Sequence, residues 1–292
     1  MVQPRDLGAP PIFDKIAILG LGLIGGSIAL AARQTWPKAL VIAVDRKDVL
    51  EQAMVKHAVD VAADEPYVIS EAELVILAAP IRQNLELLAQ LEDYVEGHAL
   101  VTDVGSTKRA IVEAARALPS RLTFIGGHPL GGAARGGFEY ARPDLFSGRP
   151  WIFTPHTDAA GDRIEKLFAF VSALGATPKT MGPAEHDRLL AYLSHLPQLA
   201  VSALMDVVGS AAGDGLALSG RGLIDTTRLA SSPAGIWQDI ASTNADQIRP
   251  ALDGLIHSLT QLRDGLDDPD VIERVFAAAR RWREHLMEGR EQ

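Results

Sequence analysis

Three glycines near the N-terminus, in the order Gly20-Leu-Gly22-Leu-Ile-Gly25, restrict the fold of this chain more than any other feature. They follow KIAILG (15–20), an apolar run typical of a buried strand, and begin LIGGSIALAARQ, a stretch with helical character. Gly20 permits a tight turn, Gly22 lets a pyrophosphate approach the backbone, and Gly25 lets helix and strand pack closely. The helix N-terminus adds free N–H groups for the phosphates. This strand–turn–helix context predicts a dinucleotide-binding site.

Asp45 ends the next strand-like run, ALVIAVD (39–45), twenty residues beyond Gly25. A carboxylate there can accept hydrogen bonds from both adenosine ribose hydroxyls and repels a 2′-phosphate, so it favours NAD over NADP. Arg46 and Lys47 follow, and either could turn towards a phosphate. The alternative without cofactor binding is a glycine turn in another kind of α/β protein, with a solvated Asp45. The other cofactor contacts that we expect are Leu23, Ile24, Ala79, Pro80 and Gly105.

Strand-like runs alternate with helical stretches through the first half of the chain. After the first two, they are ELVILAAP (73–80), HALVTDVGS (98–106), LTFIGGHP (122–129) and RPWIFTP (149–155). This alternation predicts a parallel sheet covered on both faces, and therefore an α/β Rossmann-type dinucleotide-binding domain. We place this domain at residues 1–182, because the pattern breaks at TMGP.

Residues 183–292 show helical patterns and no convincing strand, which predicts an all-α C-terminal dimerisation domain. Apolar residues recur every three or four positions through 184–209, and Pro197 within this run should kink the helix or open its hydrogen-bond ladder. This much apolar helix surface is expected to be buried against a second copy, in a homodimer. Three more helical stretches are expected near 233–246, 248–266 and 269–288.

Charge and composition argue against several classes of protein. The formal net charge is −9 with no basic block, so nucleic acid and anionic membrane are poor partners for this chain. There is no cysteine, which excludes disulfides, thiolate catalysis and cysteine-ligated metal, and no HExxH-like motif suggests another metal site. We see no apolar run that approaches a membrane span, and the first fourteen residues lack the core of a signal peptide. The expected location is the cytoplasm.

His128 is the best candidate for proton transfer. It lies in FIGGHPLGG just past a strand, where open α/β sheets bind ligands, and Pro129 restricts its backbone. A histidine titrates near neutral pH and can take a proton from a substrate hydroxyl as a hydride departs. His186 and His195 lie nine residues apart on one expected helix, which puts them about 180° apart, on opposite faces. The histidines that we interpret as solvated are His57, His98, His156, His257 and His285.

The motif Asp103-Val-Gly105-Ser106-Thr-Lys108 also stands at a strand end that leads into a helix. Gly105 and the following N–H groups could bind the cofactor or a carboxylate, and Ser106 could hydrogen-bond a substrate hydroxyl. Alternatively, Ser106 or Thr107 simply caps the helix. The spacing leaves both interpretations open.

A second ambiguous motif, Asp225-Thr-Thr-Arg228, lies in the helical half. Arginine offers a planar, permanently charged fork for a carboxylate. The structural alternative, which the sequence alone favours, is an internal Asp225–Arg228 ion pair beside a core Trp237.

Six motifs in collinear order resemble the prephenate and arogenate dehydrogenases of tyrosine biosynthesis: GLGLIGGS, DVGSTK, GGHPLGG, PDLFSGRPWIFTP, EHDRLLAYLSHLP and DTTRLASSPAGIWQDI. The resemblance covers roughly residues 15–265. It implies an NAD-dependent oxidative decarboxylation of prephenate to 4-hydroxyphenylpyruvate. It also implies a dimer built through the helical domains, with the active site in the cleft between domains.

The resemblance assigns roles to particular side chains. His128 would polarise or deprotonate the substrate hydroxyl, and Ser106 would share its hydrogen-bond network. Arg228 would bind a substrate carboxylate, supported by an ion pair with Asp225. Further positions that would line the substrate pocket are Ser194, Gln198, Ser232 and Trp237.

Three departures from the family pattern leave the substrate open. Where many relatives read HPMAGSEKSG, this chain reads HPLGGAARGG, so Ala133 and Ala134 replace a hydroxyl and a carboxylate. Gln198 stands where SHLPH has its second histidine, and it can donate a hydrogen bond but carries no charge. We find neither a regulatory nor a chorismate mutase segment, so one activity is expected.

Three alternatives accompany the prephenate interpretation. The nearest is an arogenate or dual-substrate cyclohexadienyl dehydrogenase. Another is a dehydrogenase or imine reductase on the same two-domain plan that does not decarboxylate. The non-enzyme alternative is a dinucleotide-binding sensor, against which the presence of Ser106, His128 and Arg228 argues.

Overall fold

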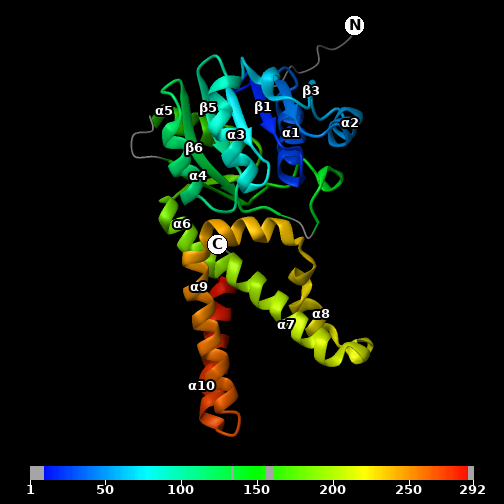
Figure 1. Cartoon of the computed structure of the whole chain (residues 1–292), viewed down its shortest axis with the longest axis vertical. Coiled ribbons are helices and arrows are strands. Elements are labelled where there is room, and N and C mark those ends of the chain that lie inside the picture. Colours follow the sequence, from blue (N-terminus) through cyan, green and yellow to red (C-terminus); the bar gives the residue numbers. More distant parts are fainter. Residues whose placement is uncertain (1–9, 133–134, 156–160, 289–292) are drawn as a thin grey trace. The chain divides into compact units, whose positions relative to one another are not determined.

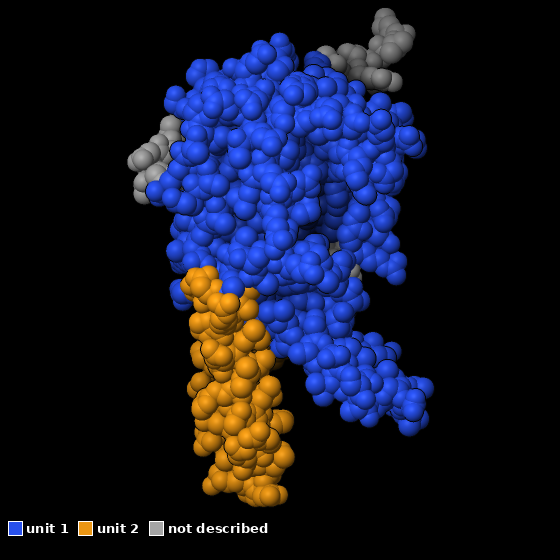
Figure 2. All heavy atoms as spheres, in the orientation of Figure 1, with its two compact units in different colours: residues 1–245 blue, residues 246–292 orange. Residues whose placement is uncertain are grey.

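The computed structural model describes residues 10–132, 135–155 and 161–288 (Figure 1). Ala133, Ala134 and His156, discussed above, lie outside these ranges. The chain forms two compact units, residues 1–245 and residues 246–292 (Figure 2). The first unit contains the sheet and the first part of the helical half, and the second consists of helices.

One eight-stranded sheet has the order β3-β2-β1-β4-β5-β6-β7-β8. The six strands expected from the sequence are all present, and the sheet also includes β3 and β8. β3 is apolar but has only three residues, and β8 (TPKT) is polar and largely exposed, so neither gives a clear strand pattern. The strands are β1 (Lys15–Leu19), β2 (Leu40–Val44), β3 (Val61–Ala63), β4 (Leu74–Leu77), β5 (Ala99–Asp103), β6 (Leu122–Pro129), β7 (Pro150–Pro155) and β8 (Thr177–Thr180).

The sheet is parallel except at one pair, β6 and β7, which run antiparallel with His128 opposite Ile152. The expectation of a wholly parallel sheet is therefore wrong at this pair. A parallel neighbour needs a long crossover, usually a helix. The described part of the β6–β7 connection holds only a 3-10 helix, η3 (Phe138–Tyr140), whereas α5 (Gly161–Ala173) joins β7 to its parallel neighbour β8.

Helices cover both faces of the sheet, as the sequence pattern predicts. Alternate residues of β1 point to opposite faces, so Ile16 and Ile18 belong to one apolar core while Ala17 and Leu19 belong to the other. The first core includes side chains of α1, α2 and α5, and the second includes side chains of α3 and α4. The helices not yet defined are α1 (Leu23–Thr35), α2 (Lys47–Val55), η1 (Pro66–Ile69), α3 (Ile81–Tyr94), α4 (Arg109–Ala114) and η2 (Ala115–Ala117).

The long helix of the C-terminal half is interrupted just before Pro197. A π-helical turn, η4 (Ala191–His195), separates α6 (Pro183–Leu190) from α7 (Leu196–Ala212). Pro197 lies in the first turn of α7, where its missing N–H costs no bond within the helix, so the interruption occurs where the sequence predicts it. The following short helices are η5 (Gly213–Leu218), α8 (Arg221–Thr226) and η6 (Arg228–Ser231).

The last two helices are α9 (Ala234–Asp264) and α10 (Pro269–Glu288). α9 has one break, at Asn244, whose φ of −138° and ψ of 21° are not helical. The sequence suggested two separate helices with a gap near residue 247. The break lies slightly earlier, and Pro250 stays within the helix.

One helical run, Pro183–Leu218, is long and apolar enough to cross a membrane by length and composition. Its most apolar window has a mean hydropathy of 1.3 and is 0% buried within the chain. We expected no such run, because no continuous apolar stretch of membrane length is visible in the sequence. A single helix of this kind is weak evidence for a membrane protein, since an apolar helix face also suits contact with another helix.

Candidate active site

The first candidate site is a cavity of about 730 Å³ at the carboxyl ends of β1, β2 and β4. β1 has β2 on one side and β4 on the other, so this is where the strand order reverses and where open α/β sheets bind ligands. Six expected cofactor residues line it: Gly20, Gly22, Asp45, Arg46, Ala79 and Pro80. Its described lining does not include Leu23, Ile24, Gly25 or Gly105.

The three glycines of the first turn meet different surroundings. Gly20 has φ of +102°, and a Cβ there would lie 2.6 Å from the Ala78 carbonyl carbon. A Cβ on Gly25 would lie 1.9 Å from the Gly20 carbonyl oxygen, so Gly25 is needed for close packing of α1. A Cβ on Gly22 would meet nothing within 4 Å. Gly22 therefore leaves open space at the N-terminus of α1, where a phosphate binds well.

Asp45 is held by backbone donors at the end of β2. Its carboxylate accepts hydrogen bonds from the N–H groups of Leu21 and Arg46, and the side chain remains partly exposed in the cavity. The carboxylate is thus fixed in place while keeping further acceptor capacity for hydroxyl groups.

The two cations after Asp45 each have an acidic neighbour. Arg46 Nη2 lies 3.6 Å from Asp48, and Lys47 Nζ lies 3.3 Å from Asp64. These pairs are exposed and therefore weak, but they offset part of the positive charge near the cavity.

A second cavity, of about 370 Å³, contains His128 at the end of β6. It is lined on the other side by residues of α6 and η4, including Leu190 and Ser194. The structure therefore brings the expected base and one expected substrate residue into one cavity. His128 is partly exposed there, since β6 ends at the next residue.

His128 is the first member of a chain of three buried or partly buried polar side chains. Its Nδ1 lies 2.9 Å from His186 Nε2, and His186 Nδ1 lies 2.8 Å from Asp187 Oδ1. Burial, followed by the neighbouring His186, Lys108 and His195, holds the pKa of His128 well below its ordinary value. His128 is thus neutral at pH 7, as a proton acceptor must be.

The sequence predicted that His186 and His195 lie on opposite faces of one helix. In the structure both are fully buried, and Asn244 contacts His195 as well as the Asp187 carbonyl beside His186. Simple helix geometry failed because the π turn lies between them. One extra residue in that turn removes about one 100° step, so the two directions differ by about 80° instead of 180°. His195 Nδ1 lies 3.3 Å from Asn244 Nδ2, and its Nε2 has no hydrogen-bond partner within the described ranges.

A buried ion pair fixes the backbone just before His128. Lys108 Nζ contacts Asp103 Oδ2 and donates to the Gly127 carbonyl at 2.7 Å, while Asp103 Oδ1 accepts from Gly127 N–H at 3.0 Å. Both side chains are fully buried, and burial lowers the pKa of Lys108 although Asp103 opposes that effect. Gly105 also holds Asp103 in place, because its N–H donates to Asp103 Oδ2 at 2.8 Å. The sequence placed this acid and this lysine in one motif but did not predict their pairing.

Asp187 joins α6 to the N-terminus of α4. Its carboxylate accepts from the N–H groups of Lys108 at 2.7 Å and Arg109 at 3.0 Å, and from Arg109 Nε at 3.2 Å. Asn244 adds a bond from its Nδ2 to the Asp187 carbonyl at 2.8 Å. A carboxylate near a helix N-terminus is favourable in both charge and hydrogen bonding.

The sequence left open whether Ser106 or Thr107 caps α4. The residue at the N-cap makes no side-chain cap bond, and Asp187 accepts the N–H groups of Lys108 and Arg109 there instead. Thr107 Oγ1 instead lies 2.8 Å from Thr243 Oγ1. Ser106 is partly buried and forms no hydrogen bond with any described residue.

The remaining expected substrate residues form separate groups. Gln198 Nε2 donates to the Leu229 carbonyl at 2.8 Å, and Gln198 Oε1 accepts from Ser232 Oγ at 3.1 Å. Gln198 therefore connects α7 both to η6 and to Ser232, the residue that follows η6. The Trp237 ring meets the His195 ring at 79°, with centroids 6.2 Å apart.

Arg228 and Asp225 are both exposed, and the supporting ion pair expected between them is absent from the described part of the chain. A six-residue helix, α8, ends between them, and the short η6 begins at Arg228. The guanidinium of Arg228 is therefore free to meet a ligand or another chain.

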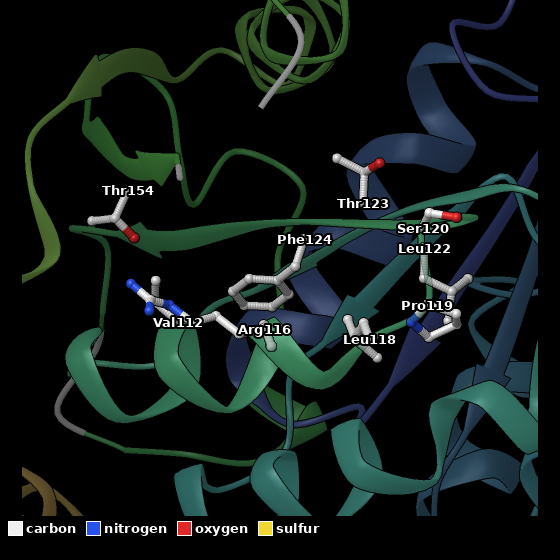
Figure 3. Close-up of a pocket in the computed structure, with 10 residues that line it drawn as sticks. Val112, Arg116, Leu118, Pro119, Ser120, Leu122, Thr123, Phe124 and Thr154 are labelled. Carbon is white, nitrogen blue, oxygen red and sulfur yellow. The ribbon is translucent and has the colours of Figure 1, made fainter. Parts of the chain in front are cut away.

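A third cavity, of about 530 Å³, lies away from these residues, between the α4–η2 segment and β6 (Figure 3). Its lining is mixed, with Phe124 and Leu118 beside the polar Arg116, and Thr154 Oγ1, which also lines it, has no described hydrogen-bond partner. None of the expected catalytic residues lines it. Within the described ranges, no group of three His, Asp or Glu side chains could hold a metal ion.

Comparison with known families agrees with the motif resemblance. The family described as "Prephenate dehydrogenase, nucleotide-binding domain" matches residues 28–179, and "Prephenate dehydrogenase, dimerization domain" matches residues 182–277. The chain is 34% identical to the prephenate dehydrogenase of Bacillus subtilis (strain 168), over 94% of this chain and 76% of the relative. It is 29% identical to the cyclohexadienyl dehydrogenase of Zymomonas mobilis, over 89% of this chain and 90% of the relative.

Solved structures of the same family have the same fold. The A. aeolicus prephenate dehydrogenase in complex with hydroxyphenyl propionate and NAD⁺ has a TM-score of 0.84 and 26% identity, over 96% of this chain and 99% of that one. The arogenate dehydrogenase of Synechocystis has a TM-score of 0.77 and 30% identity, over 93% of this chain and 99% of that one. The fold class predicted from sequence is confirmed, and this chain belongs to the prephenate dehydrogenase family of NAD-dependent oxidoreductases.

Proposed function

We propose that this protein is an NAD-dependent prephenate dehydrogenase, which oxidises and decarboxylates prephenate to 4-hydroxyphenylpyruvate in tyrosine biosynthesis. The observation that carries the proposal is a neutral His128, held by a buried polar chain at a strand end and open to a cavity. A sensor without catalysis would not need a base in this state. The family and its named relatives narrow the substrate to prephenate or its amine analogue.

The residues of the larger cavity fit a dinucleotide. Gly22 leaves open space where a Cβ would protrude, and Asp45 offers a fixed carboxylate for the ribose hydroxyls. When bound, NAD⁺ accepts the hydride from the hydroxyl-bearing carbon of the substrate. The repulsion between Asp45 and a 2′-phosphate, with Arg46 and Lys47 beside acids of their own, supports NAD over NADP.

His128 takes the proton of the substrate hydroxyl as the hydride leaves, so that the O–H bonding electrons form the carbonyl. Loss of CO₂ from the opposite ring carbon sends the electrons of the broken C–C bond through the ring to the carbonyl oxygen, so the ring becomes aromatic. That oxygen then takes back a proton, which protonated His128 can supply, to give the phenol. The driving force resides in the substrate, and the protein supplies a base, a fixed geometry and cationic binding. Arg228 is the candidate to bind a carboxylate, and the unpartnered hydroxyl of Ser106 is available for the hydroxyl of the substrate.

We also infer a homodimer formed through the helical domain. α7 exposes Leu204 and Val207, and α10, in the second unit, exposes Phe276 and Trp282. Such apolar faces are costly in water and are favourable in a helix–helix interface. The mass of the protein in solution, measured by light scattering, tests this inference, and a monomer at micromolar concentration would contradict it.

The role of His128 is tested by His128→Asn, with His98→Asn as a matched control at an exposed histidine. We expect the His128 variant to bind NAD⁺ normally but to lose about 10²–10⁴-fold in turnover, as for a lost general base. The control should behave as wild type. A His128 variant that keeps more than about a tenth of wild-type kcat would show that another group takes the proton.

A further inference from the structure

His128, His186 and Asp187 form a continuous hydrogen-bonded series that ends in the cavity. The distances are 2.9 Å from His128 Nδ1 to His186 Nε2 and 2.8 Å from His186 Nδ1 to Asp187 Oδ1. The His128 and His186 ring centroids lie 5.1 Å apart with planes at 64°. His186 and Asp187 are fully buried, so water does not compete for these bonds.

The far end of the series is a carboxylate that can only accept hydrogen bonds while it is ionised. Burial raises the pKa of Asp187, but hydrogen bonds from His186 and from the backbone N–H groups of Arg109 and Lys108 outweigh burial and lower it. Asp187 is therefore an anion at neutral pH.

The anion sets the direction of each bond in the series. Asp187 Oδ1 accepts, so His186 Nδ1 must carry a hydrogen. In a neutral His186 the other nitrogen, Nε2, then has a free lone pair and accepts from His128 Nδ1. His128 consequently carries its hydrogen on Nδ1, and its Nε2 is unprotonated.

We propose that the His186–Asp187 dyad is a positioning device that holds His128 in the Nδ1–H tautomer, leaving Nε2 as the atom that takes the substrate proton. The catalytic part of this inference rests on the proposed function, whereas the tautomer is a property of the resting protein. In the reaction, the substrate O–H bond breaks and a bond from hydrogen to His128 Nε2 forms. The resulting imidazolium still donates its Nδ1–H hydrogen bond to His186. The negative charge of Asp187 makes His186 a stronger acceptor for that bond.

The other charged or titratable groups around His128 agree with this assignment. Lys108, just before α4, and His195, at the end of η4, both lower the pKa of His128, so His128 starts the reaction neutral. Lys108 is itself paired with Asp103, and burial lowers the pKa of His195 to about 4, so His195 is also neutral. The competing arrangement has a doubly protonated His186 donating to His128 Nδ1, and it would place the hydrogen of His128 on Nε2, where it could not act as the base.

The tautomer can be read by nitrogen NMR of the substrate-free protein labelled with ¹⁵N-histidine. The resonances of His128 are assigned by their loss in His128→Asn. We expect a protonated Nδ1 and a bare Nε2, which differ strongly in chemical shift, at pH 7.5. A protonated Nε2 with a bare Nδ1 would overturn the proposal. This spectrum involves neither substrate nor turnover, so it tests the tautomer whether or not prephenate is the substrate.

Two substitutions at position 186 connect the tautomer to catalysis. His186→Phe keeps a ring of similar size but accepts no hydrogen bond, whereas His186→Gln can accept from His128 and donate to Asp187. We expect the phenylalanine variant to lose about 10- to 100-fold in kcat, the value of one hydrogen bond to a charged group, with KM for prephenate and Kd for NAD⁺ unchanged. The glutamine variant should recover most of the loss and keep the Nδ1–H signal.

A purely structural role for His186 predicts a different pattern. Both variants would then lose thermal stability, and glutamine would not recover kcat selectively. Wild-type kcat in the phenylalanine variant, or equal kcat losses in both variants, would overturn the proposal. If the phenylalanine variant does not fold, the wild-type spectrum and the glutamine variant still decide the tautomer.

Discussion

The glycine turn allows one substitution to be tested at two positions with opposite expected results. Gly25→Ala places a Cβ 1.9 Å from the backbone oxygen of Gly20, whereas Gly22→Ala places one where no atom lies within 4 Å. The first change should damage folding, and the second should damage only cofactor binding. The two variants differ by the same single methyl group, so each serves as a control for the other.

The magnitudes follow from these contacts. To reach ordinary contact, α1 and the turn must separate by about 1.5 Å in Gly25→Ala, and overpacking of a dense core costs about 1–3 kcal/mol or more. For a chain of this size that lowers Tm by about 3–10 °C. Gly22 is the N-cap residue of α1. In Gly22→Ala, the poorer cap destabilises the folded state, while the lower conformational entropy of the unfolded chain stabilises it. Each effect is under about 1 kcal/mol, so the Tm should be nearly unchanged.

The assay combines thermal unfolding without cofactor and calorimetric titration with NAD⁺. Gly22→Ala should raise Kd for NAD⁺ about 10- to 100-fold, because a methyl group overlapping the pyrophosphate costs a similar 1–3 kcal/mol. Wild-type affinity in this variant would refute our placement of the pyrophosphate over Gly22. Wild-type Tm in Gly25→Ala would refute the packing argument.

Three further predictions concern specificity, substrate binding and pH. Asp45→Ala should narrow the preference for NAD⁺ over NADP⁺, measured as the ratio of kcat/KM values, and comparable values for both cofactors in the wild type would contradict the role of Asp45. Arg228→Lys should lower kcat/KM for prephenate about 10- to 100-fold, because lysine loses the two-pronged contact with a carboxylate. The Tm should change little, because Arg228 is exposed and has no described ion pair. A lowered Tm with unchanged KM would show that Arg228 stabilises the fold and does not bind substrate. Burial lowers the pKa of His195 from 6.5 to about 4, so its contribution to stability is complete above pH 6.5 and is lost as pH falls towards 4. The loss is up to about 3 kcal/mol, and His195→Gln should flatten this part of the unfolding profile.

The sequence predicted the fold well where its signals are local. Apolar runs located six strands, and Pro197 located the interruption of the long helix. β3 and β8 were missed because one is very short and the other is polar and exposed. β7 was located, but its antiparallel direction was missed, because strand direction depends on the connection, which no apolar pattern encodes. The domain boundary near residues 180–183 stays a prediction.

The candidate site was predicted only in part, because its key contacts join segments far apart in the sequence. The position of His128 followed from its strand end, but its link to His186 depends on the π turn. Asp187 lies next to His186 in the sequence, yet its bonds to α4 span 78 and 79 residues. Gln198 was assigned to substrate from resemblance, whereas in the structure its amide is bonded within the helical half.

The measurement that tests the proposed function most directly is NAD⁺ reduction at 340 nm with prephenate and arogenate in parallel, with the products identified by mass. We predict that prephenate yields NADH, CO₂ and 4-hydroxyphenylpyruvate in equal amounts, and that prephenate has the higher kcat/KM. A higher kcat/KM for arogenate would reassign the substrate within the family. No reduction of NAD⁺ with either compound, by a folded protein that binds NAD⁺, would contradict the proposed function.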